Sequence, residues 1–292
     1  MLTPLKRSSV SQLENAYIDA CDVELEAFKP GNVSVHSEGH GMTVDDFRRS
    51  ARVSAPYLAD SKLSLGEKIY FAIEATHAEV GCNTNLGIVL LAAPLMEAVQ
   101  RNSHYNSLHS AVVAVLENTT RRDAEWVYRA IRLAKPGGLG ESDKEDVQST
   151  PNVSLTEAMG LASVRDRIAY QYVSGYKDIF KYAIKRYHGS LNRWGGPSWA
   201  VVSVFIFLLK RIPDSHIVRK YGDQYTRMVV ERMSVLEDAF SVADGPEPLT
   251  KRLREVDAEF KSLGINPGTT ADLTVACVLS VNLEILFNAF RV

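Results

Sequence analysis

The sequence predicts an all-α protein, and three observations support this prediction. Apolar residues recur with helical spacing along almost all of the 292 residues. Pairs of the form Ser/Thr-x-x-Glu/Asp, which cap the first turn of a helix, precede several of these segments. Alternating apolar and polar runs between turn residues, the pattern of strands, are absent. No Pro-, Gly- and Ser-rich linker and no internal repeat divides the chain, so we expect one compact helical domain over residues 1–292.

Four capping pairs mark the expected starts of helices. They are Ser11 with Glu14, Ser64 with Glu67, Thr120 with Asp123, and Ser154 with Glu157. The helices that they introduce are expected over 11–27, 64–80, 121–134 and 154–188, the last broken near Gly175. Apolar periodicity predicts the remaining helices over 43–58, 86–101, 107–118, 197–211, 215–243, 247–262 and 270–290.

Three of these segments are apolar on most of their circumference. They are 86–101, 197–211 and 270–290, and such helices are normally surrounded by others. A membrane span needs about 20 apolar residues. The stretch 199–209 is too short, and Asn282, Glu284 and Asn288 interrupt the last segment. We therefore expect three buried central helices and no membrane span.

Composition excludes several classes of protein. The chain has 33 Lys and Arg against 35 Asp and Glu, a net charge of −2, and 46% hydrophobic residues. These values exclude a disordered chain and a strongly basic nucleic-acid binder. The three cysteines show neither disulfide nor metal spacing, and the first fifteen residues contain no apolar segment of a signal peptide. We expect a cytoplasmic protein.

Four loops at helix boundaries are rich in Gly, Pro and polar residues. They cover 29–42, 81–87, 135–143 and 266–272. A loop that enters a helix offers unpaired N–H groups and the positive end of the helix dipole, which together bind anions. The sequence therefore predicts that these loops form a polyanion site.

Two carboxylates stand out beside these loops. Glu24 continues the apolar stripe of the first helix, just before Lys29-Pro-Gly-Asn32, and Asp272 shares a face of the last helix with Ala276. A buried carboxylate needs a partner or a cation because its desolvation is costly. The alternatives are that Glu24 is simply exposed to solvent and that Asp272 caps its helix.

A second acidic group lies near two histidines. His36 and His40 are four residues apart, and Asp45 and Asp46 follow them. The glycines beside His40 favour a loop, so hard oxygen ligands for Mg²⁺ are a better interpretation than a zinc site. The alternative is that the two aspartates only stabilise the first turn of a helix.

Two further segments carry polar side chains suited to binding. Asn83-Thr84-Asn85 precedes the most apolar helix, and three polar residues exceed what a simple cap requires. Asp214 or Ser215 can cap a helix that then presents Arg219 and Lys220, although a solvated basic turn is the alternative. Sequence signatures of nucleophilic catalysis are absent.

Taken in order, these segments resemble one family. They are Glu24…Lys29-Pro-Gly-Asn32, Asn83-Thr84, Gly138-Leu-Gly-Glu141, Asp214-Ser-His-Ile-Val-Arg-Lys220 and Asn266-Pro-Gly-Thr-Thr-Ala-Asp-Leu273. The series is similar to the triphosphoribosyl-dephospho-CoA synthases, over about residues 15–285. The resemblance implies an all-α fold and transfer of the 5-triphosphoribosyl group of ATP to the 2′-hydroxyl of dephospho-CoA, with release of adenine.

The resemblance also suggests roles for individual residues. Catalytic roles are expected for Glu24, Glu141 and Asp272, and Mg²⁺ ligation for Glu24, Asp45, Asp46 and Asp272. The residues expected to bind nucleotide and phosphate are Lys29, Gly31, Asn32, His40, Asn83, Thr84, Asn85, Gly138, Gly140, Asp214, His216, Arg219, Lys220 and Gly268.

The chain departs from the better-known members at three places. They carry Asn-Thr-His-Lys-Gly where this chain has Asn83-Thr-Asn-Leu-Gly87, and Gly-x-Arg-Gly-Glu where it has Gly137-Gly-Leu-Gly-Glu141. Gly41 also replaces the Asp that usually follows the loop histidine. Each lost basic residue removes a charge-assisted phosphate contact worth about 1.5–3 kcal/mol. This pattern indicates a divergent branch.

The functional expectation is therefore a Mg²⁺-assisted pentosyl transfer with ATP and dephospho-CoA as small-molecule partners. One alternative is a related transferase for another cofactor, such as a pterin or furan carrier of one-carbon units. The other is a non-catalytic nucleotide-binding protein. We expect no nucleic-acid partner and allow for a homodimer.

Overall fold

The computed structural model describes residues 7–39, 41–101, 105–137, 146–245 and 247–290. Helices dominate this part of the chain, and its β pairing is limited to two isolated bridges in the loop after the first helix. In chain order the elements are α1 (Arg7–Glu26), α2 (Val44–Ala59), α3 (Leu65–Val80), α4 (Leu86–Gln100), α5 (Leu108–Glu117), α6 (Arg121–Ala134), α7 (Leu155–Ala162), α8 (Arg167–Ser174), the π-helix η2 (Asp178–Ala183), α9 (Ile184–Trp194), α10 (Pro197–Arg211), α11 (Ser215–Tyr221), α12 (Thr226–Val242), α13 (Glu247–Ser262) and α14 (Gly268–Ala289). The predicted all-α class is confirmed.

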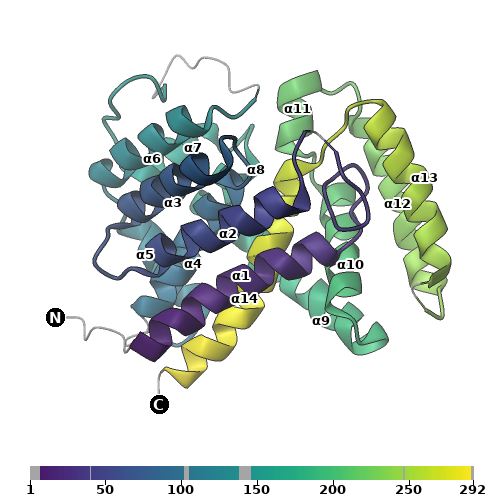
Figure 1. Cartoon of the computed structure of the whole chain (residues 1–292), viewed down its shortest axis with the longest axis horizontal. Helices are drawn as coiled ribbons and strands as arrows, with labels where there is room; N and C mark the ends of the chain where they lie inside the picture. Colours follow the sequence, from purple (N-terminus) through teal and green to yellow (C-terminus); the bar gives the residue numbers. More distant parts are fainter. Residues whose placement is uncertain (1–6, 40, 102–104, 138–145, 246, 291–292) are drawn as a thin grey trace.

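The last helix of the sequence is the centre of the molecule. In Figure 1, α14 runs in yellow between a group formed by α2 to α8 and a group formed by α9 to α13. It packs against α1 along much of its length and also contacts α4, α10, η2 and α9. The first and last helices therefore lie side by side, which places residues from opposite ends of the sequence in one region.

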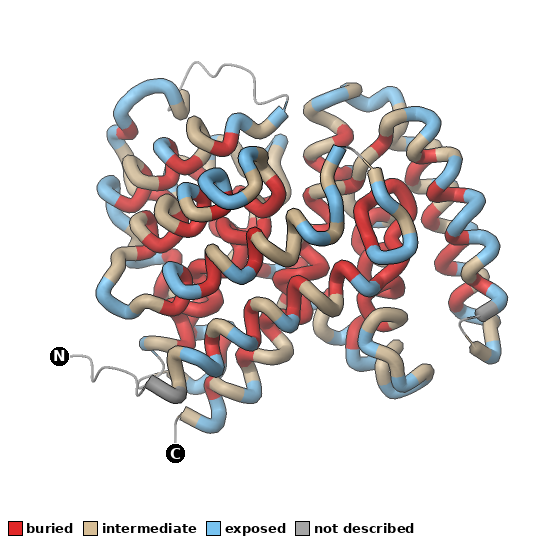
Figure 2. The backbone as a smooth tube through the Cα atoms, viewed as in Figure 1, coloured by how far each residue is buried: buried red, intermediate tan, exposed pale blue. Residues whose placement is uncertain are grey.

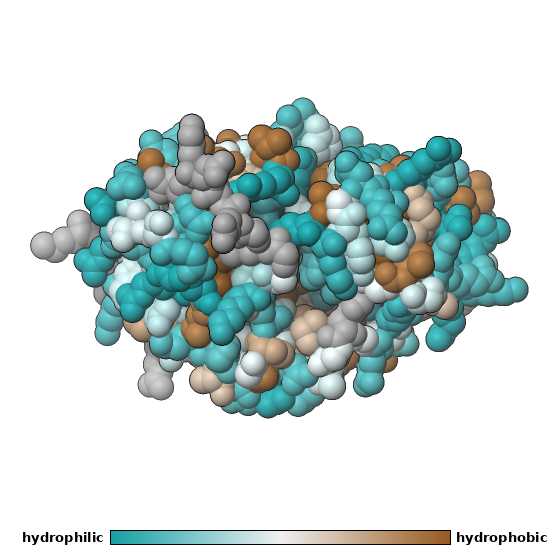
Figure 3. Space-filling view, turned by 90° about the horizontal axis from the view of Figure 1, so that it is seen from above, coloured by the Kyte–Doolittle hydropathy of each residue, from teal (hydrophilic) through white to brown (hydrophobic). Residues whose placement is uncertain are grey.

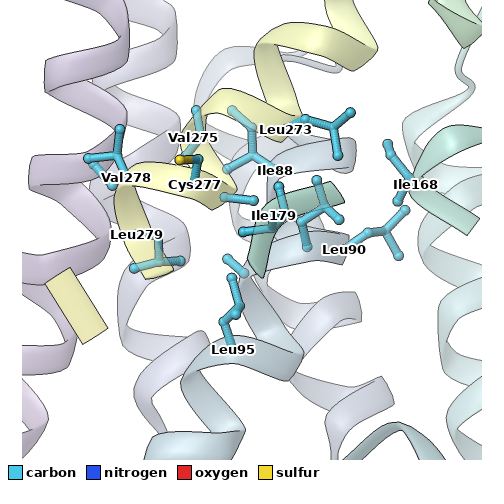
Figure 4. Close-up of a cluster of buried hydrophobic side chains, with 14 of the residues drawn as sticks. Ile88, Leu90, Leu95, Ile168, Ile179, Leu273, Val275, Cys277, Val278 and Leu279 are labelled. Atoms are coloured by element: carbon cyan, nitrogen blue, oxygen red, sulfur yellow. The ribbon is translucent and has the colours of Figure 1, made fainter. Parts of the chain in front are cut away.

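Burial confirms the three central helices. Nearly every side chain of α4 is buried, and α10 and α14 are buried along most of their length. Figure 2 shows this as continuous red in the middle of the tube. Figure 4 shows apolar side chains of α4 (Ile88, Leu90) and α14 (Leu273, Val275) in one cluster with Ile168 of α8.

One described helix is long and apolar enough to cross a membrane by length and composition, and it is α14. Within the protein, 67% of its apolar window is buried, as expected for a core helix. The face seen in Figure 3 is mainly hydrophilic, with apolar atoms in separate patches. The apolarity of α14 is thus explained by its place in the core.

Helix boundaries differ from the sequence predictions at three places. Ser11 does not cap α1, because the helix already begins at Arg7. The predicted helix over 154–188 breaks at Gly175, as expected, but also before Asp166, whose side chain caps α8. The predicted helix over 215–243 is two helices, because Gly222 has φ 60° and ends α11. This helix end, at which a glycine adopts a positive φ, was not predicted from the sequence.

Candidate active site

A cavity of about 580 Å³ lies between the two groups of helices. Its wall includes the C-terminal end of α1, the first turns of α4 and α14, the helix α11, and the helices α6 to α8. Glu24, Arg219 and Asp272 line the part beside α1, α11 and α14. The lining side chains of α6, α7 and α8 are mostly apolar, and Asp146, Arg165 and Asp166 line the adjoining segments. Pockets of about 300–1,000 Å³ with a few converging polar groups are typical of small-molecule sites.

Glu24 reaches this cavity from the last turns of α1 and forms a buried ion pair. Its Oε1 lies 3.1 Å from Nζ of Lys29, and the two side chains are 6% and 0% exposed. The same ammonium also donates hydrogen bonds to the carbonyl oxygens of Glu24, Ala27 and Val33. Burial raises the pKa of Glu24, and the Lys29 charge opposes that rise. Lys29 therefore balances the Glu24 charge and fixes the end of α1.

The loop after Lys29 is tied to the segment that precedes α14. The Gly31 N–H donates to Asp257 Oδ1 at 2.8 Å, and Asn32 Nδ2 donates to Asn266 Oδ1 at 2.9 Å. Gly31 has φ 81°, and a Cβ there would lie 2.8 Å from the carbonyl oxygen of Ile265. Only glycine fits this close approach without strain. The turn brings Asn32 and Glu24 to the first turn of α14.

Asp214 connects α11 with α14. Its Oδ1 accepts hydrogen bonds from the N–H groups of His216 and Ile217, and its Oδ2 accepts the N–H and the hydroxyl of Thr270. The carboxylate is 3% exposed and does not line the cavity. Asp214 was predicted to bind nucleotide, but its hydrogen bonds give it the role of holding His216 beside the start of α14.

The first turn of α14 lines the cavity, and Asp214 at the start of α11 caps its Thr270 N–H. Pro267 occupies the N-cap position, and Gly268 and Thr269 line the cavity. A Cβ on Gly268 would lie 3.0 Å from Nδ1 of His216, so the imidazole packs directly on this turn. The N–H groups of Gly268 and Thr270 donate to the carbonyl oxygen of Asn266 and to Asp214, whereas the positive end of the helix dipole still favours anions. With His216 beside it, this end of the helix is suited to a phosphate group.

Asp272 lies in the second turn of α14, and its carboxylate faces the cavity. The capping alternative for this residue is wrong, because the helix begins four residues earlier, at Gly268. The carboxylate accepts no hydrogen bond from the described part of the chain. Burial raises its pKa well above the ordinary value, and the charges of Asp214 and Glu24 add to the rise. The folded protein therefore favours the protonated form of Asp272 more strongly than the unfolded chain does.

Gly87 at the start of α4 makes room for this carboxyl group. A Cβ built on Gly87 would overlap Oδ2 of Asp272 and would lie 2.6 Å from its Cγ. It would also lie 2.8 Å from Cδ1 of Ile168. Asp272 therefore packs against backbone on one side, and a side chain at position 87 would push it out of place.

Gly87→Ala should lower both stability and activity. Overpacking at a buried contact costs about 1–3 kcal/mol, which urea unfolding can measure. The rate of adenine release should fall with it, because Asp272 must move. The control is Gly189→Ala in α9, where a Cβ meets nothing within 4 Å. Replacing that helical glycine by alanine should raise the free energy of unfolding by up to about 1 kcal/mol. Normal stability and rate in Gly87→Ala would contradict this account.

The 83–85 segment is held by α2 and by its own turn. Asn83 Oδ1 accepts the N–H of Leu86, and the Thr84 hydroxyl lies 2.6 Å from that of Ser50. Asn83 and Thr84 line the cavity. Asn85 lies deeper and contacts Ser54 instead. Two of the three predicted side chains of this segment therefore reach the cavity.

The turn between α7 and α8 supplies charges that sequence reasoning missed. Asp166 caps α8 through Oδ1, and its Oδ2 accepts a hydrogen bond from Arg219 at 2.7 Å. Arg165 is exposed, lines the cavity, and has no ion-pair partner among the described residues. Asp166 precedes a helix-forming segment, as N-cap residues do, and this pattern could have predicted its capping role.

The cavity collects many of the predicted site residues. Those that line it are Glu24, Asn32, Asn83, Thr84, His216, Arg219, Gly268 and Asp272. Predicted residues that pack nearby without lining it are Lys29, Gly31, Asn85 and Asp214. His40, Gly138, Gly140 and Glu141 lie outside the described residues.

Three predicted residues lie away from the cavity. Asp46 completes a capping box with Thr43, which lowers its pKa through the backbone hydrogen bond, and both Asp45 and Asp46 pair with Arg49. The exposed ammonium of Lys220 lies over the ring of Tyr221. Asp45 and Asp46, predicted as Mg²⁺ ligands, thus both lie in the first turn of α2, as their alternative required, and Asp46 caps it. Among the described residues, no three His, Cys, Asp or Glu side chains form a metal-binding group.

Comparisons with known proteins agree with this geometry. The model of one family, ATP:dephospho-CoA triphosphoribosyl transferase, matches residues 10–289. A search of curated proteins finds no match. A solved structure from Archaeoglobus fulgidus, provisionally named a triphosphoribosyl-dephospho-CoA synthase, is similar with a TM-score of 0.61 and 24% identity. The similarity covers 80% of this chain and 96% of that one, and it shows the fold. The chain belongs to the family of ATP:dephospho-CoA triphosphoribosyl transferases.

Proposed function

We propose that the cavity is where this transferase moves the 5-triphosphoribosyl group of ATP to the 2′-hydroxyl of dephospho-CoA. One observation carries the proposal. Glu24 and Asp272, from opposite ends of the sequence, line the same cavity beside the first turn of α14. Carboxylates beside a phosphate site are the groups that a pentosyl transfer from a nucleotide requires.

The reaction breaks the bond between C1′ of the ribose and N9 of adenine and forms a bond from C1′ to the acceptor oxygen. The proton of the acceptor hydroxyl ends on adenine, so atoms and charge balance. Asp272 is suited to give the leaving adenine a proton, because burial favours its protonated form. Its carboxylate can then take the proton of the acceptor hydroxyl, which returns it to its first state.

Glu24 is suited to a different task. Its ion pair with Lys29 keeps a negative charge in the wall of the cavity. This charge would stabilise the positive charge that develops on the ribose ring as adenine leaves. Because the two carboxyl groups lie in different environments, Asp272 can transfer protons while Glu24 stabilises positive charge.

The donor set also fits magnesium. A Mg²⁺ ion bound to a triphosphate usually takes only one or two protein carboxylates. Glu24 would supply one of them, and the ion would neutralise phosphate charge, whereas Asp272 would keep its proton for the adenine. That the protein is cytoplasmic and that it forms a homodimer remain predictions from the sequence.

The triphosphate would bind between α14, α11 and the turn before α8. The first turn of α14 provides the positive end of a helix dipole, and His216 and Arg219 line the adjacent wall. Leu86 lines the cavity where better-known members carry Lys. Arg165, which lines the cavity from the opposite side of Asp166, would replace part of the lost positive charge.

Arg165→Ala should therefore weaken ATP binding. Loss of one charge-assisted phosphate contact costs about 1.5–3 kcal/mol, so KM for ATP should rise about tenfold or more. The control is Arg227→Ala, because Arg227 is 93% exposed on α12 and does not line the cavity. Initial rates over a range of ATP concentrations measure both variants. An unchanged KM in Arg165→Ala would remove Arg165 from the phosphate site.

Adenine release tests the proposed function directly. The purified protein with ATP, Mg²⁺ and dephospho-CoA should produce adenine, detected by chromatography, in proportion to the acceptor consumed. Omission of dephospho-CoA is the control. Stoichiometric ATP binding without adenine would favour the non-catalytic alternative. Adenine release only with a pterin-type acceptor would favour the other cofactor pathway.

A further inference from the structure

Thr84 lies in the wall of the cavity just before α4, and two residues of α2 fix the direction of its hydroxyl. Its Oγ1 lies 2.6 Å from the hydroxyl oxygen of Ser50, which in turn lies 2.6 Å from the carbonyl oxygen of Asp46. Thr84 lines the cavity and is 8% exposed, whereas Ser50 is fully buried behind it. This chain of three oxygen atoms determines which of them carries which proton.

The positions of the protons follow from the donors that the three groups possess. Two oxygen atoms this close repel each other unless a proton lies between them. The carbonyl group of Asp46 has no proton, so Ser50 donates to it. A hydroxyl group has one proton, so the proton between Ser50 and Thr84 comes from Thr84. Toward the cavity, Thr84 can therefore act only as a hydrogen-bond acceptor.

The same arrangement occurs one turn further along α2. Ser54 donates to the carbonyl oxygen of Ser50 at 2.7 Å, so the hydroxyl of Tyr17, 3.1 Å away, donates to Ser54. A serine that donates to the carbonyl four residues earlier is a common feature of helices. Tyr17 does not line the cavity. It therefore makes the same kind of hydrogen bond as Thr84 without access to a ligand.

A hydroxyl that can only accept is unsuited to a phosphate group. Phosphate oxygens are themselves acceptors and are largely unprotonated at neutral pH. The neighbouring Asn83 has the opposite polarity, because its Oδ1 accepts the N–H of Leu86 and its Nδ2 can donate to a ligand. Phosphate therefore suits Asn83, whereas Thr84 requires a group with a proton to give. The prediction of phosphate binding at Thr84 is replaced by this requirement.

Thr84 lies close to the carboxyl group that the proposed function places at the reacting bond. Gly87 is in contact with Asp272 and lies three residues after Thr84, a distance of at most about 11 Å along the chain. On the proposed function, on which this inference rests, Asp272 faces the bond between C1′ and N9 of ATP. The 2′- and 3′-hydroxyls are the proton donors on that ribose, and the amino group of adenine lies on the far side of the base.

We propose that Thr84 accepts a hydrogen bond from a ribose hydroxyl of ATP and thereby selects ribonucleotides over deoxyribonucleotides. The 2′-hydroxyl is the expected partner, because hydrogen bonds to the hydroxyl beside the reacting carbon strengthen as positive charge develops on the ring. The 3′-hydroxyl is the other source of the same chemistry. A site built to bond a hydroxyl rejects the analogue that lacks it, because the polar group of the site is then left unpaired.

The first experiment measures binding without turnover. Titration calorimetry with Mg²⁺ and no acceptor compares ATP, 2′-deoxy-ATP and 3′-deoxy-ATP. The wild type should bind ATP at least about fivefold more tightly than one of the two deoxynucleotides, and that one identifies the hydroxyl. Thr84→Val should bind ATP as weakly as it binds that analogue. Thr84→Ser keeps the hydroxyl and should retain the preference.

The matched control is Tyr17→Phe. It also removes a hydroxyl that donates to a serine of α2, but from a residue outside the cavity lining. Its preference among the three nucleotides should equal that of the wild type. Circular dichroism checks folding, and Thr84→Ala replaces Thr84→Val if that variant does not fold. The comparison of nucleotides on the wild type needs no variant.

Three results would overturn the proposal. The first is that the wild type binds ATP and both deoxynucleotides equally. The second is that Thr84→Val weakens the binding of all three by the same factor, because Thr84 would then act on phosphate, Mg²⁺ or the fold. The third is that the loss in Thr84→Val disappears with inosine triphosphate in place of ATP, because the adenine amino group would then be the donor.

The second experiment measures turnover and separates this proposal from the proposed function. The ratio of kcat/KM for ATP to that for 2′-deoxy-ATP should be at least about tenfold larger in the wild type than in Thr84→Val. Comparing the two ratios cancels the different intrinsic reactivity of the two sugars. If no adenine forms but calorimetry shows the preference and its loss, the role of Thr84 holds and the function fails. If adenine forms and neither deoxynucleotide is discriminated against, the function holds and the role of Thr84 is wrong.

Discussion

Asp272→Asn should lower the rate of adenine release by at least about a hundredfold, the lower end for loss of an acid–base group. Asparagine keeps the size of the side chain beside Gly87, so packing is retained. The variant cannot give a proton to adenine or take one from the acceptor. Single-turnover kinetics with saturating ATP and dephospho-CoA measures the chemical step apart from binding.

The same variant should be as stable as the wild type or more stable at neutral pH. The ordinary pKa of the carboxyl group is 3.8, and burial raises it in the folded protein. Between these two pKa values the folded state keeps a proton that the unfolded state has lost, so wild-type stability falls as pH rises. Asparagine does not titrate. The stability of Asp272→Asn should therefore exceed that of the wild type above about pH 4, and the difference should vanish below about pH 4.

The control for this prediction is Asp19→Asn. Asp19 is an exposed residue of α1 and does not line the cavity. Its rate and its stability against pH should match those of the wild type. If Asp272→Asn retains the wild-type rate, Asp272 is not the acid; if it is less stable at pH 7, the carboxyl group has a partner in the folded protein.

Lys29→Met should cause a large loss of stability. Removing one partner of a buried ion pair costs about 3–5 kcal/mol, because the other charge remains buried without a partner. Glu24 is 5% exposed, and Lys29 also holds three carbonyl oxygens at the end of α1. Urea unfolding should show the loss. Adding Glu24→Gln to this variant should restore part of the stability but no activity.

Lys68→Met is a matched control for this prediction. Lys68 is also fully buried and forms an ion pair with Glu97, but neither residue lines the cavity. It should lose comparable stability, yet the folded fraction should release adenine at the wild-type rate. Lys29→Met should lose both. Equal rates in the two folded variants would show that Glu24 needs no ion pair for its task.

The fold was largely predictable because its signals are local. Capping boxes at Ser64, Thr120 and Ser154 were recognised from spacing alone, and each caps its helix in the structure. The apolar circumference of 270–290 predicted a central helix, and α14 is central. Apolar periodicity continues across Asp166 and Gly222, so it hid the breaks there.

The site was predictable only in part, because the roles of several of its residues depend on contacts between distant segments. Asp214 and Lys29 look from the sequence like ligand-binding residues, yet their partners are Thr270 and Glu24. Asp257 anchors the loop at Gly31 from more than 200 positions away, and nothing in its local sequence indicates this. Short motifs identify the segments of a site, whereas packing decides which side chains face the ligand.

The central position of α14 has a consequence for synthesis on the ribosome. Every other helix of the sequence is made before α14, including α4 and α10, whose apolar faces α14 covers. Until this helix leaves the exit tunnel, those faces stay exposed on the nascent chain, a state that favours aggregation and chaperone binding. Asp272 also arrives with it, so the protein cannot act on ATP before its core closes.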